Sequence, residues 1–185
     1  MSENPLARFD RAVLAAGTVF AGVKPEQFDD PTPCTEWSVR QLMNHLVGGH
    51  RQFMSMLSGG GPIDRSLDFL GADAAGAFQE SAAALRELFA AEGALERPAP
   101  TPFGERPGIV LLEMRVTEMM THGWDLARAT GQSTDLDPEL AEGCIGAFRA
   151  LRASGRGGDM FGPEQPAPAG ATAADRLAAA AGRRV

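Results

Sequence analysis

The stretch that decides the fold of this chain is residues 107–131, PGIVLLEMRVTEMMTHGWDLARATG. Proline suits the first turn of a helix and glycine suits the position just past its end, so a helix is predicted from about Pro107 to Ala129. Within it, Glu118 and His122 stand four residues apart. Their side chains therefore leave the same face, one turn apart, the spacing with which helical side chains can grip one metal ion.

The flanking sequence repeats the same helical spacing of apolar residues. In the segment that begins with the capping box of Ser38 and Gln41, the apolar residues Leu42, Leu46 and Phe53 keep to one face. No pair of β-strands is expected. The predicted fold class is all-α: an antiparallel four-helix bundle with extra short helices at the C-terminal end. The helices are expected over residues 4–22, 38–57, 73–91, 107–129 and 137–152, followed by a short last helix that opens at Thr172.

The chain is expected to form one domain, residues 1–185, with an unusual C-terminal part. Its Gly- and Pro-rich beginning is too long for a simple connection in a compact bundle. We expect residues 154–185 to pack on the bundle, as an irregular segment and a short helix docked through Leu177. Met160 and Phe161 would then cover an apolar pocket. A solvated tail is the alternative.

Composition excludes several classes of partner. The formal net charge of −7 argues against nucleic acid and anionic membranes, because both require a basic surface. No apolar run of about 18 residues is present, so no membrane span is expected. The N-terminal residues lack the pattern of a secretory signal, and two cysteines are too few for a disulfide framework. A cytoplasmic protein with free thiols is the expectation.

The three histidines decide where a metal site could lie. His45 lies beside Leu42 and Leu46 in the second predicted helix, so it is expected to face inward. His50 follows five residues later, about 140° around the helix, so it and His45 can hardly share one ion. A metal site would therefore combine His45 with the pair on the later helix, Glu118 and His122.

Other interpretations of these residues stay open. Glu118 lies in apolar company and needs a cation, which Arg115 or Arg128 could supply in place of a metal. The polar trio would then be a hydrogen-bonded network in the core. Asp125 could accept a proton from the imidazole of His122 or pair with Arg128. Cys34 is either a thiol near the site or a small buried apolar residue, and the role of His50 is undecided.

Three pieces of the sequence resemble one known family. They are TPCTEWSVRQLMNHLVGG at residues 32–49, MTHGWDLARATGQ at residues 120–132 with Glu118 before it, and DRLAAAAGRR at residues 175–184. Together they are similar to the DinB-like metal-binding domain of the mycothiol-dependent maleylpyruvate isomerase type, common in actinobacteria. The resemblance implies a bundle that holds a divalent ion, usually taken as zinc, near one end of the core. By motif position it implies His45, Glu118 and His122 as the metal ligands.

The resemblance also sets the expected function. Maleylpyruvate isomerase itself is similar only in its first domain and has a further C-terminal domain at its substrate site, whereas this chain ends at Val185. Three protein ligands would leave at least one position of the metal open, as in a catalytic site. We therefore expect a metal-dependent, mycothiol-type thiol S-transferase or an isomerase-like enzyme, with a thiol in that open position. Its partners would be a low-molecular-weight thiol and a small-molecule substrate, and a homodimer is left open. A non-catalytic metal-binding bundle is the alternative, and nickel or iron would suit the donors as zinc does.

Overall fold

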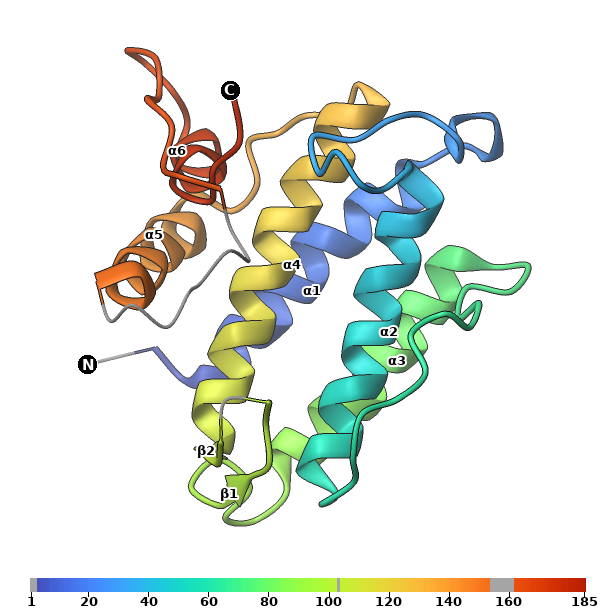
Figure 1. Cartoon of the computed structure of the whole chain (residues 1–185), viewed down its shortest axis with the longest axis vertical. Coiled ribbons are helices and arrows are strands. Elements are labelled where there is room, and N and C mark those ends of the chain that lie inside the picture. Colours follow the sequence, from blue (N-terminus) through green and yellow to red (C-terminus); the bar gives the residue numbers. More distant parts are fainter. Residues whose placement is uncertain (1–2, 103, 154–161) are drawn as a thin grey trace.

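Six α-helices make up the structure, a computed structural model that describes residues 3–102, 104–153 and 162–185 (Figure 1). Four of them form the bundle, in which α1 and α2 each pack against both α3 and α4. α2 and α4 run in opposite directions (Figure 1). The all-α fold class is thus confirmed. The helices are α1 (Pro5–Gly22), α2 (Val39–Leu57), α3 (Ala74–Ala90), α4 (Gly108–Thr130), α5 (Pro138–Ala153) and α6 (Ala173–Ala180), with a 3₁₀ turn, η1 (Pro25–Gln27).

Local signals define the helix ends as predicted. The Ser38 hydroxyl accepts from the backbone N–H of Gln41, whose side chain accepts from the backbone N–H of Ser38, so the capping box of α2 is complete. Thr172 and Asp175 form the same box at α6. Gly131 ends α4 with φ of 70°, the left-handed conformation that glycine adopts without steric cost.

The expectation that no strands would pair is wrong at one place. β1 (Pro98–Ala99) and β2 (Arg106–Pro107) form a two-residue antiparallel ladder just before α4. Proline fixes extended-compatible backbone in both segments, so they can lie side by side, but it has no N–H to donate and the ladder stays short. The ladder lies in the connection between α3 and α4, and its second strand leads directly into α4.

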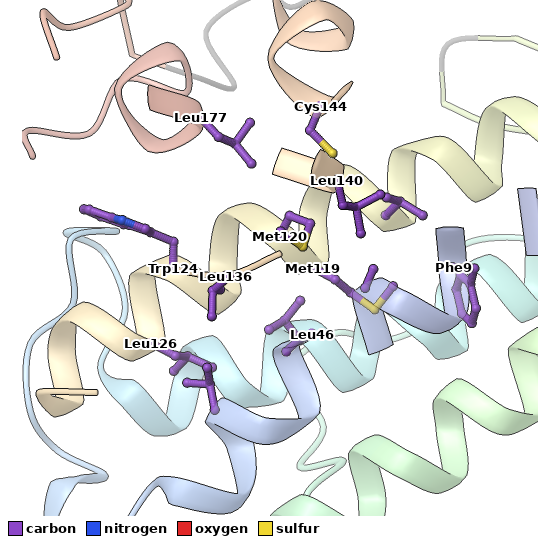
Figure 2. Close-up of a cluster of buried hydrophobic side chains, with 14 of the residues drawn as sticks. Phe9, Leu46, Met119, Met120, Trp124, Leu126, Leu136, Leu140, Cys144 and Leu177 are labelled. Atoms are coloured by element: carbon purple, nitrogen blue, oxygen red, sulfur yellow. The ribbon is translucent and has the colours of Figure 1, made fainter. Parts of the chain in front are cut away.

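α4 lies at the centre of the molecule and is buried on nearly all sides. The bundle covers one side of it, while α5 and α6 pack on the other (Figure 1). Figure 2 shows Met119, Met120 and Trp124 of α4 packed among apolar side chains of the bundle and of α5 and α6. Polar residues on such a helix lose contact with water, and each then needs a partner within the protein.

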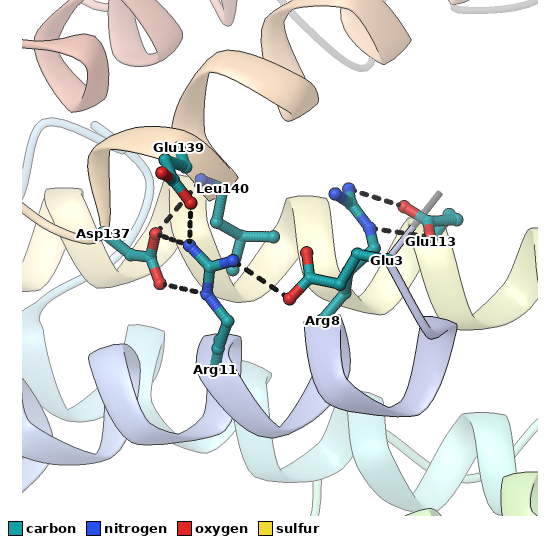
Figure 3. Close-up of polar contacts among 7 residues, drawn as sticks. All are labelled: Glu3, Arg8, Arg11, Glu113, Asp137, Glu139 and Leu140. Atoms are coloured by element: carbon teal, nitrogen blue, oxygen red, sulfur yellow. Dashed lines mark hydrogen bonds and ion pairs between the residues drawn. The ribbon is translucent and has the colours of Figure 1, made fainter. Parts of the chain in front are cut away.

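Arginines on α1 tie this helix to its neighbours at the molecular surface (Figure 3). Arg11 donates to both carboxylate oxygens of Asp137, which itself accepts from the backbone N–H of Leu140 in the first turn of α5. Arg8 forms a two-pronged bond to Glu113 of α4, at 3.1 and 3.0 Å. These pairs are partly exposed, so they orient α1 more than they stabilise the fold.

The C-terminal residues of the described chain lie against α4 and α5. Leu177 is fully buried, and the indole N–H of Trp124 donates to Asp175 Oδ1 at 2.8 Å. Met160 and Phe161 lie outside the described residues. Among the helices described, none is both long and apolar enough to cross a membrane.

Candidate metal centre

The structure brings together the three residues predicted as metal ligands. His45 extends from the first half of α2, whereas Glu118 lies at the middle of the oppositely directed α4 and His122 lies one turn further along it. One ligand atom from each residue lies within 4.8 Å of the other two. His45 Nε2 lies 2.8 Å from Glu118 Oε1, and the two imidazole centroids are 5.0 Å apart. Helix direction and four-residue spacing together produce this convergence.

His122 is oriented by a chain of buried polar contacts. Its Nδ1 lies 2.9 Å from Asp125 Oδ2, and Asp125 is fully buried. Burial alone would raise the pKa of Asp125, but hydrogen bonds from His122 and Arg183 outweigh it and lower the pKa. In the tautomer that carries its proton on Nδ1, His122 donates that proton to the ionised carboxylate, and the Nε2 lone pair is free. Such a carboxylate partner is common for histidines that bind metals.

The cation that pairs with Asp125 is Arg183, and not Arg128 as one alternative held. Arg183 lies just beyond α6, and its Nε and Nη2 donate to Oδ1 and Oδ2 of Asp125 at 3.1 and 2.8 Å. Its Nη1 donates to the carbonyl of Ala181 at 2.8 Å. The docked C-terminus therefore supports the imidazole of His122 through Asp125.

Glu118 divides its two oxygens between different neighbours. Oε1 faces His45, and Oε2 accepts from Arg115 Nη1 at 2.5 Å. Burial would raise the pKa of Glu118, but the charge of Arg115 and the hydrogen bond from His45 outweigh burial and hold the pKa well below its ordinary value. The carboxylate is therefore ionised, as a metal ligand must be. Of the two arginines predicted as partners of Glu118, Arg115 is the one that binds it.

His45 is flanked by two residues that sequence reasoning did not assign to the site. The Trp37 ring lies against its imidazole, with centroids 4.2 Å apart. Arg65 Nη2 lies 2.7 Å from its Nδ1. Burial lowers the pKa of His45, against the raising effect of Glu118, so the neutral ring is favoured. In this arrangement Nε2–H faces Glu118 and Nδ1 accepts from Arg65.

These residues fit a divalent ion. Two imidazoles and one ionised carboxylate are nitrogen and oxygen donors that suit zinc, nickel and iron. Three protein ligands leave at least one position open, as catalytic sites do and closed structural sites do not. The proton on His45 Nε2 must leave that nitrogen before it could bind an ion.

A second cluster, formed by Cys34, His122 and Asp125, also has ligand atoms within 4.8 Å of one another. It suits a metal less well. Both oxygens of Asp125 already accept from Arg183, and burial raises the pKa of the Cys34 thiol despite the lowering influence of that arginine. Cys34 therefore stands beside the candidate centre as a neutral thiol.

His50 belongs to neither cluster. It is fully buried, its Nδ1 lies 2.9 Å from the hydroxyl of Ser81 on α3, and its ring packs against Phe78. Burial holds the pKa of His50 well below its ordinary value. It is a neutral residue of the interface between α2 and α3. A separate open groove of about 560 Å³, lined in part by Arg51, Phe69 and Ala77, includes none of the candidate ligands.

Comparison with known proteins shows which family this chain resembles. The model of the family described as the mycothiol maleylpyruvate isomerase N-terminal domain matches residues 9–127. Two uncharacterized proteins of Mycobacterium tuberculosis, from strains CDC 1551 / Oshkosh and ATCC 25618 / H37Rv, are each 43% identical to the chain over 184 residues, which is 98% of the chain and 99% of each relative. No solved structure shows a significant match to the chain.

Proposed function

Since the chain belongs to the mycothiol maleylpyruvate isomerase N-terminal domain family, we propose that it binds a divalent metal ion through His45, Glu118 and His122 and acts on a low-molecular-weight thiol. The observation that carries the proposal is the convergence of these three side chains from two helices. Glu118 is ionised, and His122 is held by a hydrogen bond to Asp125. His45 Nε2 faces Glu118 and would have to give up its proton to bind an ion.

A bound divalent ion lowers the pKa of a thiol in its open position, so that a thiolate nucleophile exists near neutral pH. The chain's own residues supply the rest. Asp125 holds the imidazole of His122 in one orientation, and Arg183 holds Asp125. Trp37 packs on the ring of His45 and limits its rotation. These contacts prepare the three donors before any ligand arrives.

The reaction that follows from this chemistry is attack of the whole thiolate, its S–H proton already lost, on an electrophilic carbon of a small molecule. In a transferase the new C–S bond forms as a leaving group departs with its electron pair; in an isomerase-like enzyme the thiolate adds to a double bond and is expelled again after the bond has rotated, so the thiol is regenerated. Mycothiol is the proposed thiol, on the strength of the family. The rival function is a non-catalytic centre in which the ion only joins α2 to α4. Zinc is the proposed ion, and the donor set is equally consistent with nickel or iron.

Elemental analysis of protein purified without an affinity tag tests the ligand set. We expect about one divalent ion per chain in the native protein, and its loss in His45→Ala and in His122→Ala. His50→Ala is the matched control, because it removes a buried histidine from the same helix outside the cluster. An equal loss of metal in His50→Ala would refute the assignment.

A cobalt-substituted protein tests the thiol. Addition of mycothiol should produce a thiolate-to-cobalt charge-transfer band in the near ultraviolet if the sulfur enters the open position. Stoichiometric metal without such a band would favour the rival function. Retention of the band in His50→Ala and its absence in His122→Ala would support the proposal.

A further inference from the structure

Arg115 is an unusual neighbour for a metal site because it is a fully buried cation. Its side chain has no exposed surface, and its guanidinium lies over the ring of Phe53, 5.3 Å from the ring centroid. Nη2 donates to the carbonyl of Leu46 at 3.3 Å, and Nε has no hydrogen-bond partner among the residues described. Burying a charge in this way costs free energy of folding unless the charge pairs with an ionised group of opposite sign.

A glycine on α2 leaves the space that the guanidinium of Arg115 occupies. Gly49 of α2 faces it, and a Cβ at that position would overlap Arg115 Nη1. The adjacent Gly48 faces a different neighbour, since its Cβ would meet the ring of Phe69 at 3.0 Å. Gly49 therefore lets the arginine approach α2 and reach Glu118, whereas Gly48 serves packing alone.

The partner of Arg115 is one oxygen of Glu118. Nη1 donates to Oε2, and the other oxygen, Oε1, is the one beside His45 Nε2. An ion among His45, Glu118 and His122 would therefore meet a carboxylate whose second oxygen is already taken. We infer that Arg115 is a positioning residue that confines Glu118 to one oxygen at the metal and shares its negative charge with the ion. The inference rests on the proposed function.

Two consequences follow for the centre. A carboxylate that binds through one oxygen occupies one coordination position instead of two, so a position stays open for a thiol. A buried arginine so close to a divalent ion would also leave the ion poorly neutralised, because it shares the carboxylate charge of Glu118 and because like charges repel strongly in a poorly hydrated site. Such a centre attracts an anionic ligand and favours the thiolate over the thiol. Arg115 thus weakens metal binding and strengthens the effect of the metal on its ligand.

The sign of a change in metal affinity tests the inference. Arg115→Met removes the charge at similar length, so we expect zinc to bind about tenfold more tightly in competition with a chelator, an effect of the size known for groups that contact metal ligands. Arg115→Lys keeps the charge and should retain an affinity close to that of the native protein. A purely structural role for Arg115 predicts weaker binding in both variants, and that result would overturn the inference.

A second pair of variants serves if Arg115→Met does not fold. Gly49→Ala should displace the guanidinium from Glu118 and tighten zinc binding, whereas Gly48→Ala, one residue away, should leave zinc affinity unchanged. Equal zinc affinity in the two alanine variants would overturn the inference. Failure of the native protein to bind zinc, nickel or iron would refute the proposed function itself. If the native protein binds zinc but Arg115→Met or Gly49→Ala binds it equally well or more weakly, only the role of Arg115 is refuted.

Discussion

At the scale of single residues, the candidate centre depends on which nitrogen of each histidine carries a proton. His122 has the arrangement that ligation needs, because Asp125 accepts from Nδ1 and leaves Nε2 free. His45 has the opposite arrangement, because Arg65 approaches Nδ1 and Nε2–H faces Glu118. An ion on Nε2 would leave the remaining ring proton on Nδ1, where it would oppose the N–H of Arg65. Metal and Arg65 therefore compete for His45.

Arg65→Ala is predicted to bind zinc more tightly than the native protein, by about threefold to tenfold. The variant removes a hydrogen bond that exists only while His45 Nδ1 is an acceptor, and such a bond contributes roughly 1 kcal/mol. Isothermal titration with zinc measures the change. Arg51→Ala is the control, because Arg51 packs over Phe69 outside the candidate centre. Unaltered affinity in Arg65→Ala would show that the two do not compete.

Asp125→Asn should weaken zinc binding by about 10- to 100-fold, the usual cost of losing the outer partner of a metal-bound histidine. The amide has nearly the shape of the carboxylate, but it carries no charge for Arg183 and holds the Nδ1 proton of His122 less strongly. A chelator competition assay measures the affinity. Asp135→Asn, at an exposed position, should have no effect. If both variants bind zinc like the native protein, Asp125 does not support the centre.

At the scale of elements, α6 joins the core to the candidate centre. Its Leu177 is buried among α4 and α5, and the residues just beyond the helix place Arg183 against Asp125. Trp124 adds a polar contact to Asp175 in the first turn of α6. The helix has few residues of its own, so packing must supply most of its stability.

Leu177→Ala is predicted to lower the free energy of unfolding by about 2–5 kcal/mol, the cost of removing a fully buried leucine side chain. Urea denaturation followed by circular dichroism measures it. Leu14→Ala is the matched control, because Leu14 is 70% exposed and its truncation should change stability by less than about 0.5 kcal/mol. Comparable losses in the two variants would mean that α6 is not held by Leu177.

At the scale of the whole molecule, the candidate ligands connect α2 and α4, the two helices that also meet at Gly49 and Arg115. An ion that binds only the folded chain stabilises it by mass action. The arginines differ between the two regions: those of the α1 pairs in Figure 3 are partly exposed, whereas the side chains of Arg115 and Arg183 are 0% and 9% exposed.

Zinc at about 100 times its dissociation constant should therefore raise the free energy of unfolding by about 2.7 kcal/mol, seen as a higher melting temperature. Glu118→Gln should reduce the increase, because it removes the anionic donor. Scanning calorimetry with and without a chelator measures both. A melting temperature that zinc and chelator leave unmoved would mean that no ion joins α2 to α4.

The sequence by itself determined the all-α class and the ends of the helices, and it predicted the three candidate ligands. Capping boxes at Ser38 and Thr172 and the four-residue spacing of Glu118 and His122 are local, so they depend on helix geometry alone. The short β ladder was missed because its pairing needs the turn between two proline-containing segments, which has no periodic signal.

Only the tertiary structure decided which charges meet. Asp125 pairs with Arg183, 58 residues away, and not with the neighbouring Arg128, because the docking of α6 brings the distant arginine to the buried face of α4. Arg115 reaches Glu118 because Gly49, on another helix, leaves room for it. Such contacts depend on how helices pack, and no spacing along one helix encodes them.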